Sequence, residues 1–160
     1  MEAKELVHQY GDMLFRICLI TLCNEHDAQD AVQETFCRYL MRDTGFTDQI
    51  HEKAWLIRVA ANICRDMLRF HTRHPLVDIE QLSDHYAVPE QQEMLEELMF
   101  LPRKLKTVIL LYYVEGYSQK EIAEILHISE AAVRKRMQRG REQLKWFIQA
   151  RTQKGGCVHE

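Results

Sequence analysis

The sequence predicts an all-α protein of two small helical domains joined by a flexible acidic linker, with a C-terminal helix-turn-helix. Apolar residues recur at helical spacing through most of the 160 residues, strand-like alternation is missing, and the chain has 6 glycines and 3 prolines. Hydrophobic residues make up 46% of the chain, enough for two small cores. We expect an N-terminal domain at 1–74, a linker at 75–90, a C-terminal domain at 91–150 and a frayed tail at 151–160.

Three helices are expected in the N-terminal domain. Apolar spacing predicts one over 5–23 and a second over 27–42, with Asp27 as the N-cap of the second. The polar stretch 43–52 predicts a loop. A long third helix is expected over 53–73, because a proline follows it at position 75.

The third helix carries a basic face opposite its apolar one. Its members recur at helical spacing: Arg58, Asn62, Arg65, Arg69 and Arg73. Guanidinium groups can hold phosphates, and a central amide can read a base edge. The alternative is an exposed arginine face with a solvated Asn. Near the start of the same helix, Trp55 is expected to pack at the core or its rim rather than to stack on a base.

The second helix has a mostly acidic and polar surface between its apolar positions. This surface comprises Asp30, Gln33, Glu34 and Arg38, whereas Phe36 is expected to face inward. A helix surface of this kind is usually only solvated, so the residues themselves favour that interpretation over a partner site.

Two closely spaced helix starts predict the helix-turn-helix. Ser118 and Glu121 form a capping-box pattern at the first start, and Ser129 is expected to cap the second helix. His127 lies in the tight turn, where it can adopt the left-handed conformation more readily than most residues. Two further helices are expected before this motif, at 90–100 and 102–116.

The second helix of this motif separates an apolar stripe from a basic surface. The stripe comprises Val133, Met137, Gly140, Leu144 and Phe147, and Gly140 is expected to let the first helix of the motif approach closely. The remaining surface carries Arg134, Lys135, Gln138, Arg139, Arg141 and Lys145. Between positions 134 and 154 there are eight Lys or Arg residues and one acid, Glu142. So dense a positive charge favours contact with DNA over a merely solvated face.

Charge is segregated along the chain. The net charge is only −3, and the segment 78–97 holds seven acids and no Lys or Arg. A protein that held DNA unaided would normally be basic overall, so a partner is expected to help it bind. The five cysteines show no CxxC spacing, and four sit in apolar helical phase as buried thiols do, which favours a reducing cytosol. Neither a signal peptide nor a membrane span is evident.

Three segments in order resemble bacterial RNA polymerase sigma factors. Residues 27–36 (DAQDAVQETF) resemble the helix that docks on the polymerase clamp, and residues 55–66 (WLIRVAANICRD) resemble the helix that reads the −10 element. Residues 101–144, which begin Leu-Pro, resemble the domain that reads the −35 element. The short length and two helical domains are similar to the extracytoplasmic-function (ECF) group.

The resemblance implies a role for each surface. A sigma factor binds core RNA polymerase and promoter DNA, helps melt the start site and is then released, and it needs no cofactor, metal or small-molecule substrate. The implied polymerase-binding residues are Asp30, Gln33, Glu34 and Phe36. The implied −10 residues are Arg58, Asn62, Arg65 and Arg69, with Asn62 engaging a flipped-out base that the loop at 43–52 helps to enclose. The implied −35 residues are Arg134, Lys135, Gln138, Arg139 and Arg141.

The resemblance also implies an anti-sigma factor as a partner, membrane-tethered as in much of the group, which would hold a cytoplasmic protein at the membrane. The chain departs from the family pattern in two places. Ala131-Ala132 stands where Gly-Thr is frequent, so a hydroxyl that could bond a phosphate is absent, and His127 replaces the usual Gly.

Two other functions are considered. A free-standing helix-turn-helix regulator would need only the C-terminal domain and should bind its operator without polymerase. A metal enzyme could use His71, His74 and Cys64, but the two histidines lie where a helix should fray and nothing completes a tetrahedral set. The sequence therefore favours a sigma factor that is not an enzyme.

Overall fold

The computed structural model describes residues 2–70 and 96–155, and for 146–155 it describes the helical backbone only. The chain divides into two compact units, residues 1–92 and 93–160. Every regular element of the described residues is a helix, which confirms the predicted all-α class. The expected linker at 75–90, Arg73 and both candidate histidine ligands lie outside the described residues.

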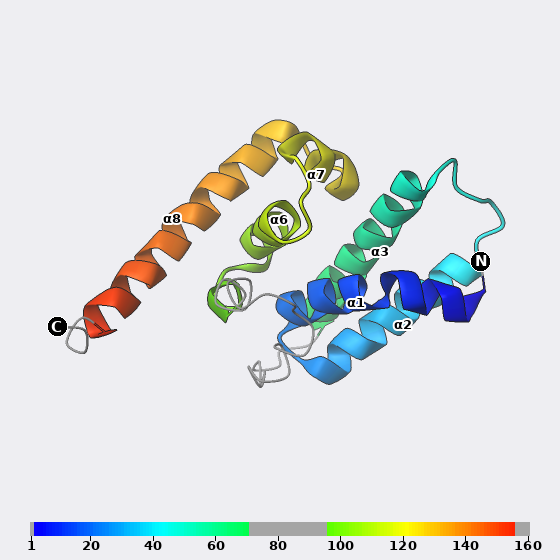
Figure 1. The fold of residues 1–160 in the computed structure, drawn as a ribbon, viewed down its shortest axis with the longest axis horizontal. Coiled ribbons are helices and arrows are strands. Elements are labelled where there is room, and N and C mark those ends of the chain that lie inside the picture. Colours follow the sequence, from blue (N-terminus) through cyan, green and yellow to red (C-terminus); the bar gives the residue numbers. More distant parts are fainter. Residues whose placement is uncertain (1, 71–95, 156–160) are drawn as a thin grey trace. The chain divides into compact units, whose positions relative to one another are not determined.

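Three helices form the first unit (Figure 1): α1 spans Ala3–Leu22, α2 spans Glu25–Leu40 and α3 spans Gln49–Phe70. Each of them packs against the other two. The fully buried side chains that they share include Leu6, Leu14, Ile17 and Ile20 from α1, Ala28 and Ala31 from α2, and Leu56, Ile57 and Ala60 from α3. Small alanines let α2 and α3 approach α1, while the branched side chains of α1 fill the space between them.

The helix boundaries of this unit differ from the predicted ones. Asn24, not Asp27, is the N-cap of α2, because the Asn24 side chain accepts a hydrogen bond from the Asp27 amide at 2.9 Å. Helix α3 starts at Gln49, inside the stretch expected as a loop. The Asp48 carboxylate accepts a hydrogen bond from the His51 amide at 2.8 Å, so a capping residue inside a polar segment starts α3 early. The loop between α2 and α3 is therefore residues 41–48.

The cysteines were expected to be mostly buried. Cys18 on α1 and Cys64 on α3 are fully buried, and Cys23 is buried at the end of α1. A hydrogen bond with the Cys64 thiol, together with burial, raises the pKa of Cys18 well above its usual value. Cys37 is exposed on α2, so the prediction was wrong there, and Cys157 lies outside the described residues.

The second unit contains α6 (Arg103–Tyr113), α7 (Gln119–Leu126) and α8 (Glu130–Gly155) (Figure 1). Both α6 and α7 pack against α8. Fully buried side chains come from all three helices: Val108, Ile109, Leu110, Ile122, Val133 and Met137. Helix α8 continues to Gly155, into the segment that was expected to be a frayed tail.

Gly140 allows a close helix contact, but the partner is not the predicted one. A Cβ atom at this position would lie 2.8 Å from Cγ1 of Ile109 and 3.0 Å from its Cδ1. Ile109 belongs to α6. The predicted partner was α7, which is the first helix of the helix-turn-helix. Gly140 therefore sets the distance between α6 and α8, and α7 is positioned through other contacts.

None of the helices in the described ranges has both the length and the apolar character needed to cross a membrane.

Candidate nucleic-acid and partner surfaces

The helix-turn-helix forms through the predicted caps. The Glu121 amide donates to Ser118 Oγ at 3.1 Å, and the Ser118 amide donates to Glu121 Oε2 at 2.7 Å, which completes the capping box of α7. Ser129 Oγ accepts from the Ala132 amide at 3.0 Å at the start of α8. His127 adopts the left-handed conformation with φ 54°, so the turn forms without glycine, as predicted. These local interactions fix the direction in which α8 leaves the turn.

Helix α8 presents the predicted polar surface to solvent. Arg134, Lys135, Gln138 and Arg139 are exposed, whereas Val133 and Met137 on the opposite side are fully buried. In the part of the chain that the structure describes, no ion pair includes Arg134, Lys135 or Arg139. Their charge is therefore not neutralised by any described residue and is available to an anionic partner.

Among the cations of α8 whose side chains are described, Arg141 differs because α6 holds it. Its Nε donates to the Tyr113 hydroxyl at 2.8 Å, and its guanidinium carbon lies 5.7 Å from the ring centroids of both Tyr112 and Tyr113. These tyrosines were not among the residues predicted from the sequence. The only hint in the sequence was the Tyr112-Tyr113 pair at the end of a helix, where one ring must face outward.

The residues of α3 that were predicted to contact DNA lie along one side of the helix, but they differ in exposure and in ion pairing. Asn62 and Arg69 are exposed, and Arg58 is half-buried. The Arg65 guanidinium lies 3.3 Å from the Asp66 carboxylate, so one of the cations is already paired. The basic face of α3 therefore carries a weaker positive field than that of α8, with an exposed amide near its centre.

The polar surface of α2 is exposed at Asp30, Gln33 and Glu34. Glu34 pairs with Arg38 at 2.9 Å, one helical turn away. Phe36 is only 9% exposed, so it belongs to the core of the unit and does not lie on this surface. Burial of Phe36 instead holds α2 against its neighbours and so fixes the position of the exposed residues on the same helix.

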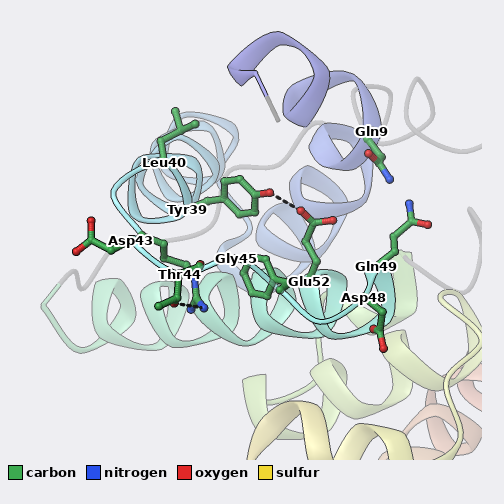
Figure 2. A pocket seen from close by; sticks show the side chains of 11 residues that line it. Gln9, Tyr39, Leu40, Asp43, Thr44, Gly45, Asp48, Gln49 and Glu52 are labelled. Atoms are coloured by element: carbon green, nitrogen blue, oxygen red, sulfur yellow. Dashed lines mark hydrogen bonds between the residues drawn. The ribbon is translucent and has the colours of Figure 1, made fainter.

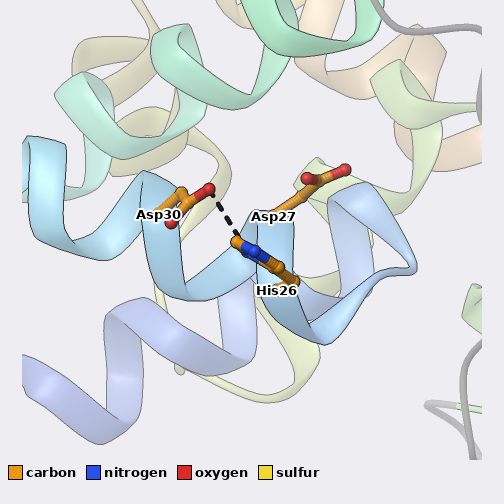
Figure 3. A group of neighbouring side chains, drawn as sticks. All are labelled: His26, Asp27 and Asp30. Atoms are coloured by element: carbon orange, nitrogen blue, oxygen red, sulfur yellow. Dashed lines mark ion pairs between the residues drawn. The ribbon is translucent and has the colours of Figure 1, made fainter.

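In the first two turns of α2, the side chains of His26, Asp27 and Asp30 place potential ligand atoms within 4.8 Å of one another (Figure 3). His26 and Asp30 form an ion pair at 3.3 Å when the imidazole is protonated. Acidic residues are also favoured at a helix N-terminus because the helix dipole is positive there. These interactions account for the group without a metal ion, and the absence of a metal site stays a prediction.

A buried carboxylate, which the sequence analysis placed in a loop, links all three helices of the first unit. Glu52 is 8% exposed, and its Oε2 accepts from the Tyr10 hydroxyl at 2.8 Å. Its Oε1 accepts a hydrogen bond from the Tyr39 hydroxyl (Figure 2). Burial, followed by the hydrogen bond to Glu52, raises the pKa of both Tyr10 and Tyr39 to about 12. Burial of this carboxyl group is tolerated because two tyrosine hydroxyls form hydrogen bonds with its oxygens.

The loop at 41–48 borders a cavity of about 610 Å³ that Glu52 also lines. Gln9 from α1 and Gln49 from α3 line it as well (Figure 2). Stacking holds the loop in place: the Arg42 guanidinium lies 4.3 Å from the ring centroid of Phe46 and 4.7 Å from that of Trp55. Trp55 therefore has the packing role expected for it, and the loop that it anchors has a defined shape.

The two units together define a protein of the sigma-70 class. Residues 6–74 match the family described as Sigma-70 region 2, and residues 91–144 match the family described as Sigma-70, region 4. The ECF RNA polymerase sigma factor SigW of Bacillus subtilis (strain 168) is 30% identical over 160 residues, which cover 88% of this chain and 86% of SigW. The chain belongs to the ECF RNA polymerase sigma factor family.

Two solved structures resemble the fold. One contains CnrH in complex with the cytosolic domain of CnrY; it is 28% identical, has a TM-score of 0.67, and covers 92% of this chain and 88% of CnrH. The other contains the sigma factor RpoE of Bartonella quintana with the anti-sigma factor NepR; it is 19% identical, has a TM-score of 0.70, and covers 91% and 96% of the two chains.

Family membership confirms the predicted function. The chain is a sigma factor, a non-enzymatic subunit that directs RNA polymerase to promoters. The match to region 2 also decides between the two DNA-binding alternatives, because a free-standing regulator would need only the helix-turn-helix unit.

Proposed function

We propose that the two units divide promoter recognition between a duplex-reading helix, α8, and a helix that reads separated bases, α3. The observation that carries this proposal is the difference in charge between the two. Arg134, Lys135 and Arg139 on α8 have no ion-pair partner among the described residues, whereas Arg65 on α3 is paired with Asp66.

In this proposal α8 enters the major groove of the −35 element. Residues near the N-terminus of a recognition helix contact base edges, which assigns base reading to Arg134, Lys135, Gln138 and Arg139. Arg141 lies further along the helix and contacts the phosphate backbone. A good bidentate contact between a side chain and a base contributes ~1–3 kcal/mol of discrimination.

Helix α3 reads the −10 element through Asn62, with Arg58, Arg65 and Arg69 holding phosphates on either side. The Asn62 amide is exposed and can both donate to and accept from a base edge. Extruding a base from the stack costs a few kcal/mol, which the polymerase complex supplies. The anchored loop at 41–48 and its cavity offer a shaped enclosure for the extruded base.

Helix α2 docks on the clamp region of core RNA polymerase through Asp30, Gln33 and Glu34. Phe36 contributes from within the core by fixing the helix rather than by touching the polymerase. Docking explains how a protein with a net charge of −3 comes to bind DNA, because the polymerase supplies the remaining contacts to phosphates.

Regulation in this proposal is by an anti-sigma factor that covers the docking helix. The support comes from the similar fold of the RpoE structure, in which a sigma factor is bound to an anti-sigma factor. The sigma factor would act in the cytoplasm, and a membrane-tethered anti-sigma partner would keep it at the membrane until a signal releases it.

The experiment that tests this proposal measures binding to a promoter fragment with and without core RNA polymerase. We expect weak binding by the protein alone and specific binding after core enzyme is added. Selection from a randomised promoter pool then identifies the preferred −35 and −10 bases. Tight specific binding without polymerase, or unchanged start-site choice after the protein is added, would contradict the proposal.

A further inference from the structure

The hydrogen bond between Tyr113 and Arg141 joins residues that are 28 positions apart and both lie at the surface. Tyr113 occupies the last turn of α6 and is 46% exposed, so its hydroxyl is not there to satisfy a buried group. An exposed hydrogen bond of this kind adds little to the stability of the core, so a role in function is considered for it.

Arg141 lies on the same side of α8 as the residues proposed to read the −35 element. Arg134, Gln138 and Arg141 follow one another at intervals of four and three residues, which places them along one flank of the helix. Arg134 and Gln138 lie toward the N-terminus, where base edges are read. Arg141 is therefore placed beyond the bases, where side chains meet the phosphate backbone.

The geometry at Arg141 leaves its terminal nitrogens for another acceptor. The bond to Tyr113 uses Nε, and the two aromatic rings lie 5.7 Å from the guanidinium carbon. A guanidinium group has five donors in a fixed plane, so the nitrogens that remain can still donate to a phosphate oxygen. A long side chain loses rotamer freedom when it binds, and a hydroxyl that already holds it reduces that loss.

We propose that Tyr113 is a positioning residue for promoter recognition: its hydroxyl holds the Arg141 guanidinium in place for one phosphate of the −35 element. This inference rests on the proposed function of α8. It differs from a purely structural role, in which the bond would only tie α6 to α8 and would leave DNA binding unchanged.

The test compares Tyr113→Phe with Tyr112→Phe in reconstituted holoenzyme. Both variants keep an aromatic ring beside Arg141, but only Tyr113→Phe removes the hydroxyl that accepts from Nε. Dissociation constants for a promoter fragment are measured over a series of salt concentrations. We expect Tyr113→Phe to weaken binding roughly 2-fold to 10-fold, the effect of losing one hydrogen bond. The slope of log Kd against log salt should fall by up to ~0.9, the contribution of one phosphate contact.

Arg141→Ala should reproduce both changes, and adding Tyr113→Phe to it should change nothing more, because the two residues act as one unit. Tyr112→Phe should match the wild type. A wild-type Kd and salt slope in Tyr113→Phe would overturn the proposal, and so would a lowered melting temperature with an unchanged slope, which indicates the structural role. If wild-type holoenzyme itself ignores the −35 sequence, the proposed function of α8 fails before Tyr113 is considered.

Discussion

Helices α3 and α8 are both basic, but they hold their charge in different ways. Between residues 130 and 145, α8 carries six Lys or Arg residues and two acids, whereas α3 has four and two over its whole length. On α3, Arg65 pairs with Asp66, and the exposed amide of Asn62 stands between the cations. Unpaired cations on α8 suit the phosphates of duplex DNA, and an exposed amide on α3 suits hydrogen bonding to a base edge, which is the division of labour proposed above.

The largest expected effect comes from removing, on each helix, the side chain proposed to read a base. Arg139→Ala should reduce discrimination among −35 sequences by up to about 3 kcal/mol and leave the −10 preference intact, because only the bidentate base contact is lost. Asn62→Ala should do the reverse. The measurement is transcription by reconstituted holoenzyme from promoters that are varied at one element at a time. Loss of both preferences in either variant would contradict a division of labour.

The buried carboxylate of the first unit should have the next largest effect. Glu52→Leu leaves the hydroxyls of Tyr10 and Tyr39 without their acceptor, so we expect a loss of about 2 kcal/mol in the free energy of unfolding. Glu52→Gln keeps one acceptor oxygen and should lose less. Denaturant titration of each variant tests this. Equal stability of all three proteins would mean that the hydrogen-bonded cluster is not needed to hold the helices together.

Docking on the polymerase should respond to charge on α2. Glu34→Lys places a cation on the exposed polar surface, and we expect it to weaken binding to core enzyme by about 1 kcal/mol. The fold should persist, because the lost ion pair with Arg38 is exposed and such pairs contribute ~0–1 kcal/mol. Asp12→Lys on α1 makes the same charge change at another exposed position and serves as the control. Should Glu34→Lys unfold the unit, Glu34 has a structural role instead.

A further effect is expected at alkaline pH. The folded protein raises the pKa of Tyr10, Tyr39 and Tyr117 from 10.0 to about 12, chiefly through burial. Between pH 10 and 12 the unfolded chain has therefore released protons that the folded chain retains, so the free energy of unfolding falls as pH rises through this window. Phenolate absorbance during a pH titration should show delayed ionisation of these tyrosines. In the Tyr39→Phe variant, the number of delayed groups should fall by one.

Local features of the sequence predicted local structure well. The Ser118–Glu121 capping box, the Ser129 cap and the left-handed His127 all depend on residues within a few positions of one another, and all form as expected. The start of α2 was misplaced because Asn24 and Asp27 are both good caps and lie three positions apart. A local pattern could not choose between them.

Contacts between distant residues could not be predicted. Gly140 was expected to allow close packing, but only the fold shows that Ile109 of α6 is its neighbour. Glu52 looked like a loop residue because a charged side chain is seldom buried, and the tyrosine hydroxyls that make its burial possible come from two other helices. The partnership of Tyr113 with Arg141 was hidden for the same reason. The exposed face of α8 could be predicted because periodicity alone separates it from the buried stripe.

The anchoring of the α2–α3 loop has a practical consequence for engineering. Arg42 and Phe46 lie within the loop, and Trp55 lies about two turns into α3. The stacking interactions that shape the loop therefore come mostly from one short stretch of chain. This segment can be transplanted together with its stacking partners, provided that the recipient keeps the tyrosines at positions 10 and 39 that bind Glu52. Grafting residues 41–55 between members of the family would show whether the loop sets the −10 preference, as proposed above.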